Sequence, residues 1–213
     1  MYSLKLNNMK MQKTSILAAF ILLISAAVNG QNLRFGLSAG VDVSRLALSG
    51  ASGGPVVNKT NVAGGLSFEA MISSNFGIQL DASYSSQGAG VIYDDGSTSG
   101  SYQLDYITIP VVAKLYGTKN LSFVVGPQVG FLIKANTRST GNPDVDVKDQ
   151  LENIDFYAVF GTEYRFNNGI FVSGRYHLGV SNLVKDETLN QDLKNRYLSF
   201  RIGYSFPLGG TKK

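Results

Sequence analysis

Residues along most of the chain alternate one by one between apolar and polar side chains. In the first clear run, residues 34–44, the apolar positions are Phe35, Leu37, Ala39, Val41 and Val43. Because successive side chains of a β-strand point to opposite faces, this pattern predicts a strand with one apolar and one polar face. Seven more strands are predicted near residues 61–72, 76–87, 101–116, 120–134, 154–166, 170–181 and 196–206.

The connections between these strands are of two kinds, which alternate along the chain. The short ones, at 73–75, 117–119 and 167–169, are rich in Ser, Asn and Gly, which suit tight turns. The long polar ones are residues 47–59, 88–100, 135–153 and 182–195. Short periplasmic turns and long outer loops are typical of outer-membrane barrels, whereas a soluble sandwich has no reason to alternate in this way. The predicted fold is therefore all-β, an eight-stranded antiparallel up-and-down transmembrane β-barrel.

Charges of both signs occupy the polar faces, although only 16% of the residues are charged. In lipid, strands satisfy their backbone groups only by closing into a barrel, so we expect the apolar faces to meet lipid. The interior of eight strands is just wide enough to be filled by side chains. We expect a packed polar interior network of Arg34, Asp42, Glu69, Asp81, Lys114, Asp155, Glu163, Arg165, Arg175, His177 and Arg201, with Lys134 also facing inward.

Aromatic residues are placed near the ends of the predicted apolar faces, as in the two girdles of membrane barrels. The short-turn end has Phe35, Phe76, Tyr164, Phe166, Tyr204 and Phe206, and the loop end has Tyr84, Phe131, Phe156 and Tyr197. Pro110 and Pro127 fall inside predicted strands. Since proline lacks the N–H that a ladder needs, each is expected to mark a bulge or a local break.

The first 30 residues are predicted to be a signal peptide that is removed. Lys5, Lys10 and Lys13 precede an apolar run at 16–24, and small residues then lead to a cleavage site before Gln31. A single anchoring helix is the alternative, but this run is shorter than the ~20 residues that spanning requires. Cleavage would leave 16 basic and 15 acidic residues, a net charge of +1. Without a basic stripe, a nucleic-acid partner is not expected.

Two segments resemble a known family. Residues 106–114, YITIPVVAK, resemble the Y-x-x-I-P-x-x-x-K strand of PorT-like outer-membrane β-barrel proteins, and residues 195–206 resemble their closing strand with its G-Y-x-F ending. Residues 164–166 and 174–179 fit the same pattern. The resemblance implies a porin-family, OmpA/OmpX-like barrel domain of the Bacteroidota type over residues 31–206; some family members are accessories of protein secretion. The tail 207–213 departs from the pattern, because such barrels usually stop at the terminal aromatic residue.

Residues with potential for chemistry are few. His177, the only histidine, could have Ser173, Asp155 and Glu163 as neighbours, but a hydrogen-bonded interior histidine is the simpler interpretation. The carboxylates of residues 142–149 suit Ca²⁺, but they lack the spacing of a known calcium loop. Residues 186–194 could form a short helix over the outer mouth. No catalytic residue, cofactor or metal is expected.

Three functions remain compatible with this pattern. The first is a structural or loop-mediated binding barrel of the cell outer membrane, in contact with the lipid bilayer and lipopolysaccharide and, through the long loops, with an envelope or extracellular partner. The second is a narrow pore for small solutes, and the third is an enzyme at the outer leaflet. Paired interior charges favour the first.

Overall fold

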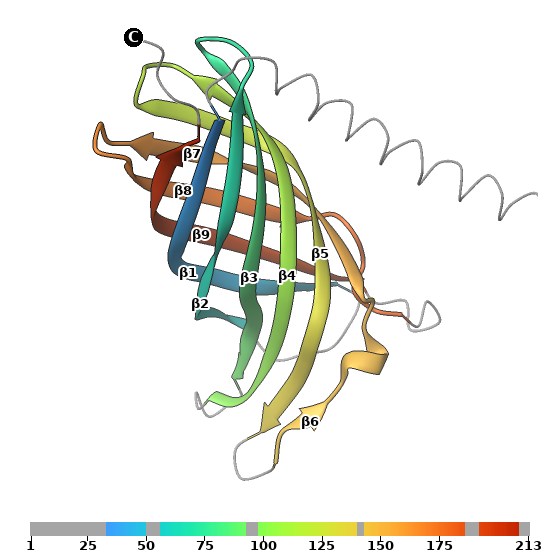
Figure 1. Ribbon diagram of the computed structural model, residues 1–213. Helices are drawn as coiled ribbons and strands as arrows, with labels where there is room; N and C mark the ends of the chain where they lie inside the picture. Colours follow the sequence, from blue (N-terminus) through green and yellow to red (C-terminus); the bar gives the residue numbers. More distant parts are fainter. Residues whose placement is uncertain (1–32, 50–55, 93–97, 140–142, 186–191, 209–213) are drawn as a thin grey trace, which may run out of the picture.

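Eight long strands form one closed antiparallel sheet in the computed structural model, which describes residues 33–49, 56–92, 98–139, 143–185 and 192–208 (Figure 1). The strands are β1 (Leu33–Ser49), β2 (Val56–Met71), β3 (Phe76–Ile92), β4 (Thr98–Tyr116), β5 (Leu121–Ser139), β7 (Ile154–Arg165), β8 (Ile170–Gly179) and β9 (Asp192–Pro207). Each pairs with its neighbours in sequence, and β1 pairs with β9 to close the wall. The predicted eight-stranded barrel is confirmed. The proposed signal peptide, residues 1–30, lies outside the described residues.

Two short elements interrupt the connection between β5 and β7. They are β6 (Val145–Asp146), which pairs with β5, and the 3₁₀ turn η1 (Lys148–Gln150). Within the described ranges, no helix is both long and apolar enough to cross a membrane.

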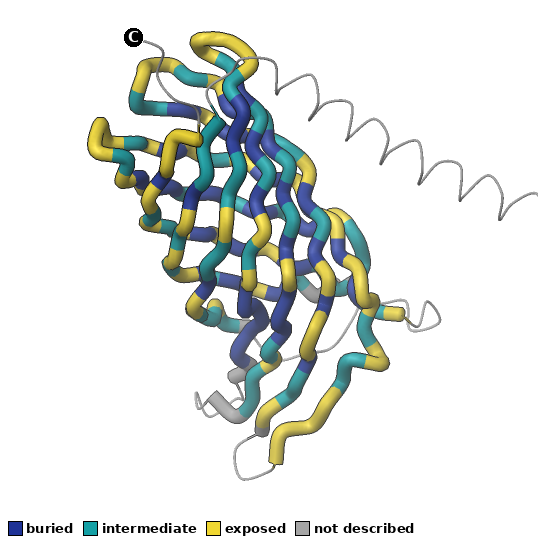
Figure 2. Tube along the Cα trace, in the orientation of Figure 1, coloured by how far each residue is buried: buried dark blue, intermediate teal, exposed yellow. Residues whose placement is uncertain are grey.

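Burial alternates along most of the wall, which therefore has one enclosed and one exposed side; near the loop end, residues 85–90 of β3 and 104–106 of β4 are all buried (Figure 2). The exposed side is the apolar one: Phe123 is 53% and Ile202 60% exposed, whereas Lys114 is completely buried. A soluble protein rarely exposes so continuous an apolar surface. This arrangement is the one expected of a wall that faces lipid.

The strands at the loop end are longer than the sequence indicates. β1 continues to Ser49 and β2 already begins at Val56, and β5 continues to Ser139, so part of each segment expected to be a loop is strand. The apolar alternation does not continue into these extensions: in β1 Arg45 takes the outward position and Leu46 the buried one, and residues 135–139 are mostly polar. The proposed helix at 186–194 is wrong for residues 192–194, which belong to β9, and its remaining residues lie outside the described ranges.

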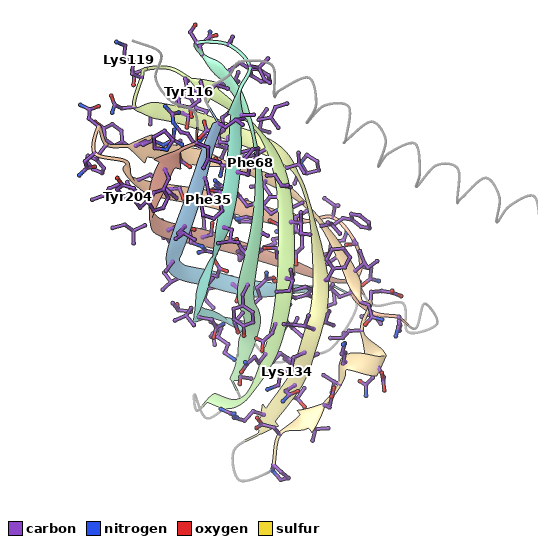
Figure 3. The ribbon with its side chains drawn as sticks, in the orientation of Figure 1. Phe35, Phe68, Tyr116, Lys119, Lys134 and Tyr204 are labelled. Carbon is purple, nitrogen blue, oxygen red and sulfur yellow. The ribbon has the colours of Figure 1, made fainter. Side chains whose placement is uncertain are left out.

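The prediction that Lys134 faces the interior is wrong. Asp105 pairs with Lys134 but Tyr106 pairs with Leu132, so Ile133 is the extra residue of a β-bulge. Because a bulge shifts the alternation by one residue, Ile133 and Lys134 both lie exposed on the outside. Lys134 therefore projects near the loop end, far from Lys119 at the short-turn end (Figure 3).

Two further expectations concern single residues. Beside Pro110, two residue pairs are missing from the ladder between β3 and β4. Beside Pro127, two residue pairs are missing from the ladder between β4 and β5. The register is unchanged across each break, so these are local breaks and not bulges.

Tyr197, expected in the outer aromatic girdle, is instead buried in the interior, because β9 turns its even-numbered residues outward.

Inward glycines allow large interior rings to fit. A Cβ on Gly203 would lie 2.4 Å from the carbonyl oxygen of Leu37 and 2.5 Å from the ring of Phe171. A Cβ on Gly130 would lie 3.2 Å from the ring of Tyr106 and 3.3 Å from that of Tyr157. The space that these glycines leave is therefore used by neighbouring atoms.

We expect Gly203→Ala to lower the free energy of unfolding by about 1–3 kcal/mol, because the new methyl group overlaps backbone and ring atoms. Gly174→Ala is the matched control, since its Cβ would meet only the ring of Phe200 at 3.7 Å. It should be neutral or stabilising by about 0.4–1 kcal/mol. Urea unfolding of the refolded protein in detergent micelles, followed by circular dichroism, compares the two, and equal effects would contradict the packing described here.

Candidate functional site

The barrel interior at the short-turn end holds a cluster of ion pairs that crosses from one wall to the other. This basal ion cluster consists of Arg34, Glu69, Asp81, Lys114, Glu163, Arg165 and Arg175, from six of the eight strands. Lys114 Nζ lies 3.3 Å from Glu69 and 2.7 Å from Glu163. Since freeing one buried charge would leave its partner uncompensated, these contacts hold the side chains across the lumen.

Three arginines, Arg165, Arg175 and Arg34, add further ion pairs to the basal ion cluster. Arg165 Nη2 lies 2.5 Å from Glu69 and 2.8 Å from Glu163, and the hydroxyl of Tyr116 also donates to Glu69. Arg175 joins the cluster to Asp81 at 2.5 Å and to Glu163 at 3.7 Å. Arg34 stands at the rim, partly exposed and 4.0 Å from Glu69.

A separate ion pair lies farther along the lumen. Arg201 Nη2 is 2.7 Å from Asp42, and Ser85 donates a hydrogen bond of 2.5 Å to the other oxygen of that carboxylate. Between this pair and the basal ion cluster is a cavity of about 30 Å³, lined mainly by hydroxyl groups and by Arg175, His177 and Arg201. A polar space of this size accommodates roughly two water molecules.

His177 forms two side-chain hydrogen bonds in the interior, and neither is to a residue suggested by the sequence. Its Nδ1 is 2.8 Å from Gln128 Oε1 and its Nε2 is 3.0 Å from Ser199 Oγ. Since the amide oxygen only accepts, Nδ1 carries the proton and Ser199 donates to Nε2. Tyr197 stacks on the imidazole at 4.0 Å. A serine beside a histidine resembles a nucleophilic pair, but the third group is an amide and the pair is buried.

Asp155 lies in the interior, as expected, but forms no ion pair with any described residue. Ser181 donates to its Oδ1, while its buried Oδ2 has no hydrogen-bond partner among the described residues. Nearby, the amide of Gln87 accepts hydrogen bonds from Tyr157 and Asn195. The interior is therefore polar but uncharged at this level, apart from Asp155.

Apolar side chains close the interior at the loop end. This outer cap consists of Leu46, Ala89, Leu104, Tyr106, Leu132, Ala135 and Leu183. Leu183 comes from the connection after β8 and is completely buried. Its backbone N–H donates to Leu193 and its carbonyl accepts from Glu152, both at 2.9 Å. Sequence reasoning missed the outer cap, because one leucine in a polar connection gives no periodic signal.

The acidic segment after β5 is engaged with its own chain. Arg138 binds Asp144 through two hydrogen bonds of 2.8 Å, and this contact holds the pKa of the Asp144 carboxyl below its usual value. Asp146 accepts a hydrogen bond from the backbone N–H of Lys148. In the part of the chain that the structure describes, no group of three or more His, Asp or Glu side chains could hold a metal ion.

Replacing Lys114 by Met tests the basal ion cluster. We expect the free energy of unfolding to fall by about 3 kcal/mol, because Glu69 and Glu163 lose a buried partner while the side-chain volume is nearly kept. Arg138→Met is the control, since its ion pair with Asp144 is exposed and should leave stability unchanged. Urea unfolding in micelles measures both, and a Lys114→Met protein as stable as the unmodified one would refute this assignment of the ion pairs.

The comparisons with known proteins agree with this architecture. Residues 25–185 match the family model described as outer membrane protein beta-barrel domain. Among solved structures, Neisserial surface protein A is 12% identical, with 81% of this chain and 97% of that chain covered and a TM-score of 0.54. Ail, the attachment invasion locus protein of Yersinia pestis, in its complex with the heparin analogue sucrose octasulfate, is 16% identical, with 82% and 99% covered and a TM-score of 0.50.

At these identities, the likeness to solved structures establishes the fold alone. No curated protein matches the sequence. The family match covers well over half of the chain, and the exposed apolar wall fits a lipid environment. The chain therefore belongs to the outer membrane protein β-barrel domain family and is a protein of the outer membrane.

Proposed function

We propose that the protein is a non-conducting envelope barrel that acts through its outer end, as a structural or binding accessory. The observation that carries this proposal is that side chains fill the lumen at successive levels along the barrel axis, from the basal ion cluster through the hydrogen-bonded polar residues to the outer cap. Lys114, Gln128 and Leu183, one from each level, are all buried. Since the charges are held by several partners each, moving them aside for a solute is unfavourable.

A narrow pore is the second candidate, and the hydroxyl-lined cavity favours it. At about 30 Å³, however, the cavity holds roughly two water molecules, and it lies between the basal ion cluster and the Arg201–Asp42 ion pair, with the outer cap beyond. An enzyme at the outer leaflet receives less support. Ser199 and His177 are both buried inside the wall, so a lipid substrate outside would not reach them.

The outer end is where a partner would bind. β4 and β5 remain paired as far as Gly100 and Ser139, whereas β7 pairs with β5 only as far as Ile154, so the β4–β5 side of the wall extends farther at the loop end, which is the lower end in Figure 1. Loops on a rigid scaffold commonly carry binding functions. We further assign the chain to the PorT-like, porin-family type on the strength of residues 106–114, and lipopolysaccharide is its proposed lipid partner.

Planar-bilayer recording tests the non-conducting proposal. The pure refolded protein should insert without steady single-channel steps, because the filled lumen leaves no continuous path. Leu183→Gly, which removes the centre of the outer cap, should also be silent, since the ion pairs below remain. Insertion is verified by the faster gel mobility of unheated protein recovered from the same vesicles. Reproducible steps from the unmodified protein would replace this proposal by the pore.

A further inference from the structure

Two arginines lie directly opposite each other on the outside of the barrel. Arg45 of β1 pairs in register with Arg196 of β9, and both are exposed. Side chains opposite each other on antiparallel strands have Cβ atoms about 5 Å apart, and like charges there repel. Within the described part of the chain, neither guanidinium has a hydrogen bond or an ion pair. Among the described residues, the fold therefore keeps an unfavourable pair of charges that no carboxylate relieves.

The arginine pair follows directly on the apolar wall. From the short-turn end, the outward pairs between β1 and β9 are Phe35–Phe206, Leu37–Tyr204, Ala39–Ile202, Val41–Phe200 and Val43–Leu198, and the next pair is Arg45–Arg196. Phe35 and Tyr204 mark the beginning of this run (Figure 3). Five consecutive apolar pairs thus end at one doubly cationic pair.

The height of the arginine pair matches the edge of the membrane. Ten residues separate Phe35 from Arg45. At about 3.3 Å per residue and a strand tilt of about 40°, Arg45 lies roughly 25 Å above Phe35. The lipid-facing band of outer-membrane barrels is also about 25 Å tall. Because short turns lie on the periplasmic side, the arginines reach the headgroup level of the outer leaflet.

The described stretches beside the arginine pair provide positive charge and apolar contact but no acid. Lys194 is one outward position beyond Arg196 and pairs with Ala47, while Leu178 of β8 lies opposite Arg196. No carboxylate points outward from β8, from β1 over residues 33–47 or from β9 over residues 194–206, within these described stretches. Asp42, the acid nearest in β1, is buried and bound to Arg201.

We infer that Arg45 and Arg196 form a binding site for a phosphate group of the outer-leaflet glycolipid, the phosphorylated diglucosamine anchor of lipopolysaccharide. Two guanidinium groups present several N–H donors to one phosphate, which neutralises their repulsion. Leu178, Leu198 and Val43 lie beside and just below them, where an acyl chain of the same lipid would run. The inference rests on the proposed partnership with lipopolysaccharide and is independent of whether the barrel conducts.

The test compares the Arg45→Gln/Arg196→Gln protein with the unmodified one, both refolded in zwitterionic detergent. Lys119→Gln/Arg138→Gln is the control, because it removes two exposed positive charges from the short turn and from the outer end of β5. Native mass spectrometry is used to titrate each protein with bisphosphorylated lipid A, dephosphorylated lipid A and phosphatidylglycerol. We expect the arginine variant to bind bisphosphorylated lipid A at least tenfold more weakly, and the control within twofold of the unmodified protein.

Stability gives a second readout that does not depend on the gas phase. Without lipid A, the arginine variant should have a thermal midpoint at least as high as the unmodified protein, since it lacks the repulsion. With lipid A, only the unmodified protein and the control should gain stability.

Each other outcome overturns a different statement. Equal lipid A binding by the arginine variant would overturn the site alone. No binding of lipid A by the unmodified protein would overturn both the site and the glycolipid partner. Equal affinity for phosphatidylglycerol or for dephosphorylated lipid A would overturn the recognition of a glycolipid phosphate.

Discussion

Backbone hydrogen bonding in lipid is the constraint on which this structure depends. A strand that crosses a membrane must pair on both edges, because no water is present to satisfy its N–H and C=O groups. The ladder between β1 and β9 meets this demand by closing the sheet. Closure separates an inside from an outside, and the two-residue period of a strand then distributes the side chains between them. The apolar wall and the polar interior are thus two consequences of one requirement.

The interior must then be filled and its charges neutralised. Tyr106, Pro110 and Lys114 illustrate how one strand contributes, since these positions, four apart in β4, all face inward. Tyr106 belongs to the outer cap, Pro110 lines the cavity and Lys114 joins the basal ion cluster. β4 therefore contributes one residue to each of three levels of the lumen, and the spacing of four follows from which residues of the strand face inward.

Sequence periodicity predicted the barrel, its strand number and the side of the wall on which Leu37, Ile202 or Lys114 lies, because lipid demands an uninterrupted apolar alternation there. It failed where that demand ends. Lys134 follows a bulge that alternation cannot reveal, and residues 85–90 in the outer part of β3 are all buried, without alternation. Sequence periodicity also could not predict which side chains contact each other. His177 contacts Gln128 and Ser199 because of the strand register. Leu183 packs in the outer cap because the chain after β8 passes over the loop end of the barrel.

The ladder between β1 and β9 also has a consequence for the order of folding. Hairpins such as β2–β3 form between strands that are close in the sequence, but Phe35 pairs with Phe206, near the other end of the chain. Closing so long a loop costs more entropy than any hairpin, and non-local pairing of this kind slows folding. Until it forms, β1 and β9 each present an unpaired edge, which hydrocarbon does not tolerate. Insertion and closure are therefore expected to occur as one cooperative step, with no stable half-built wall in the bilayer.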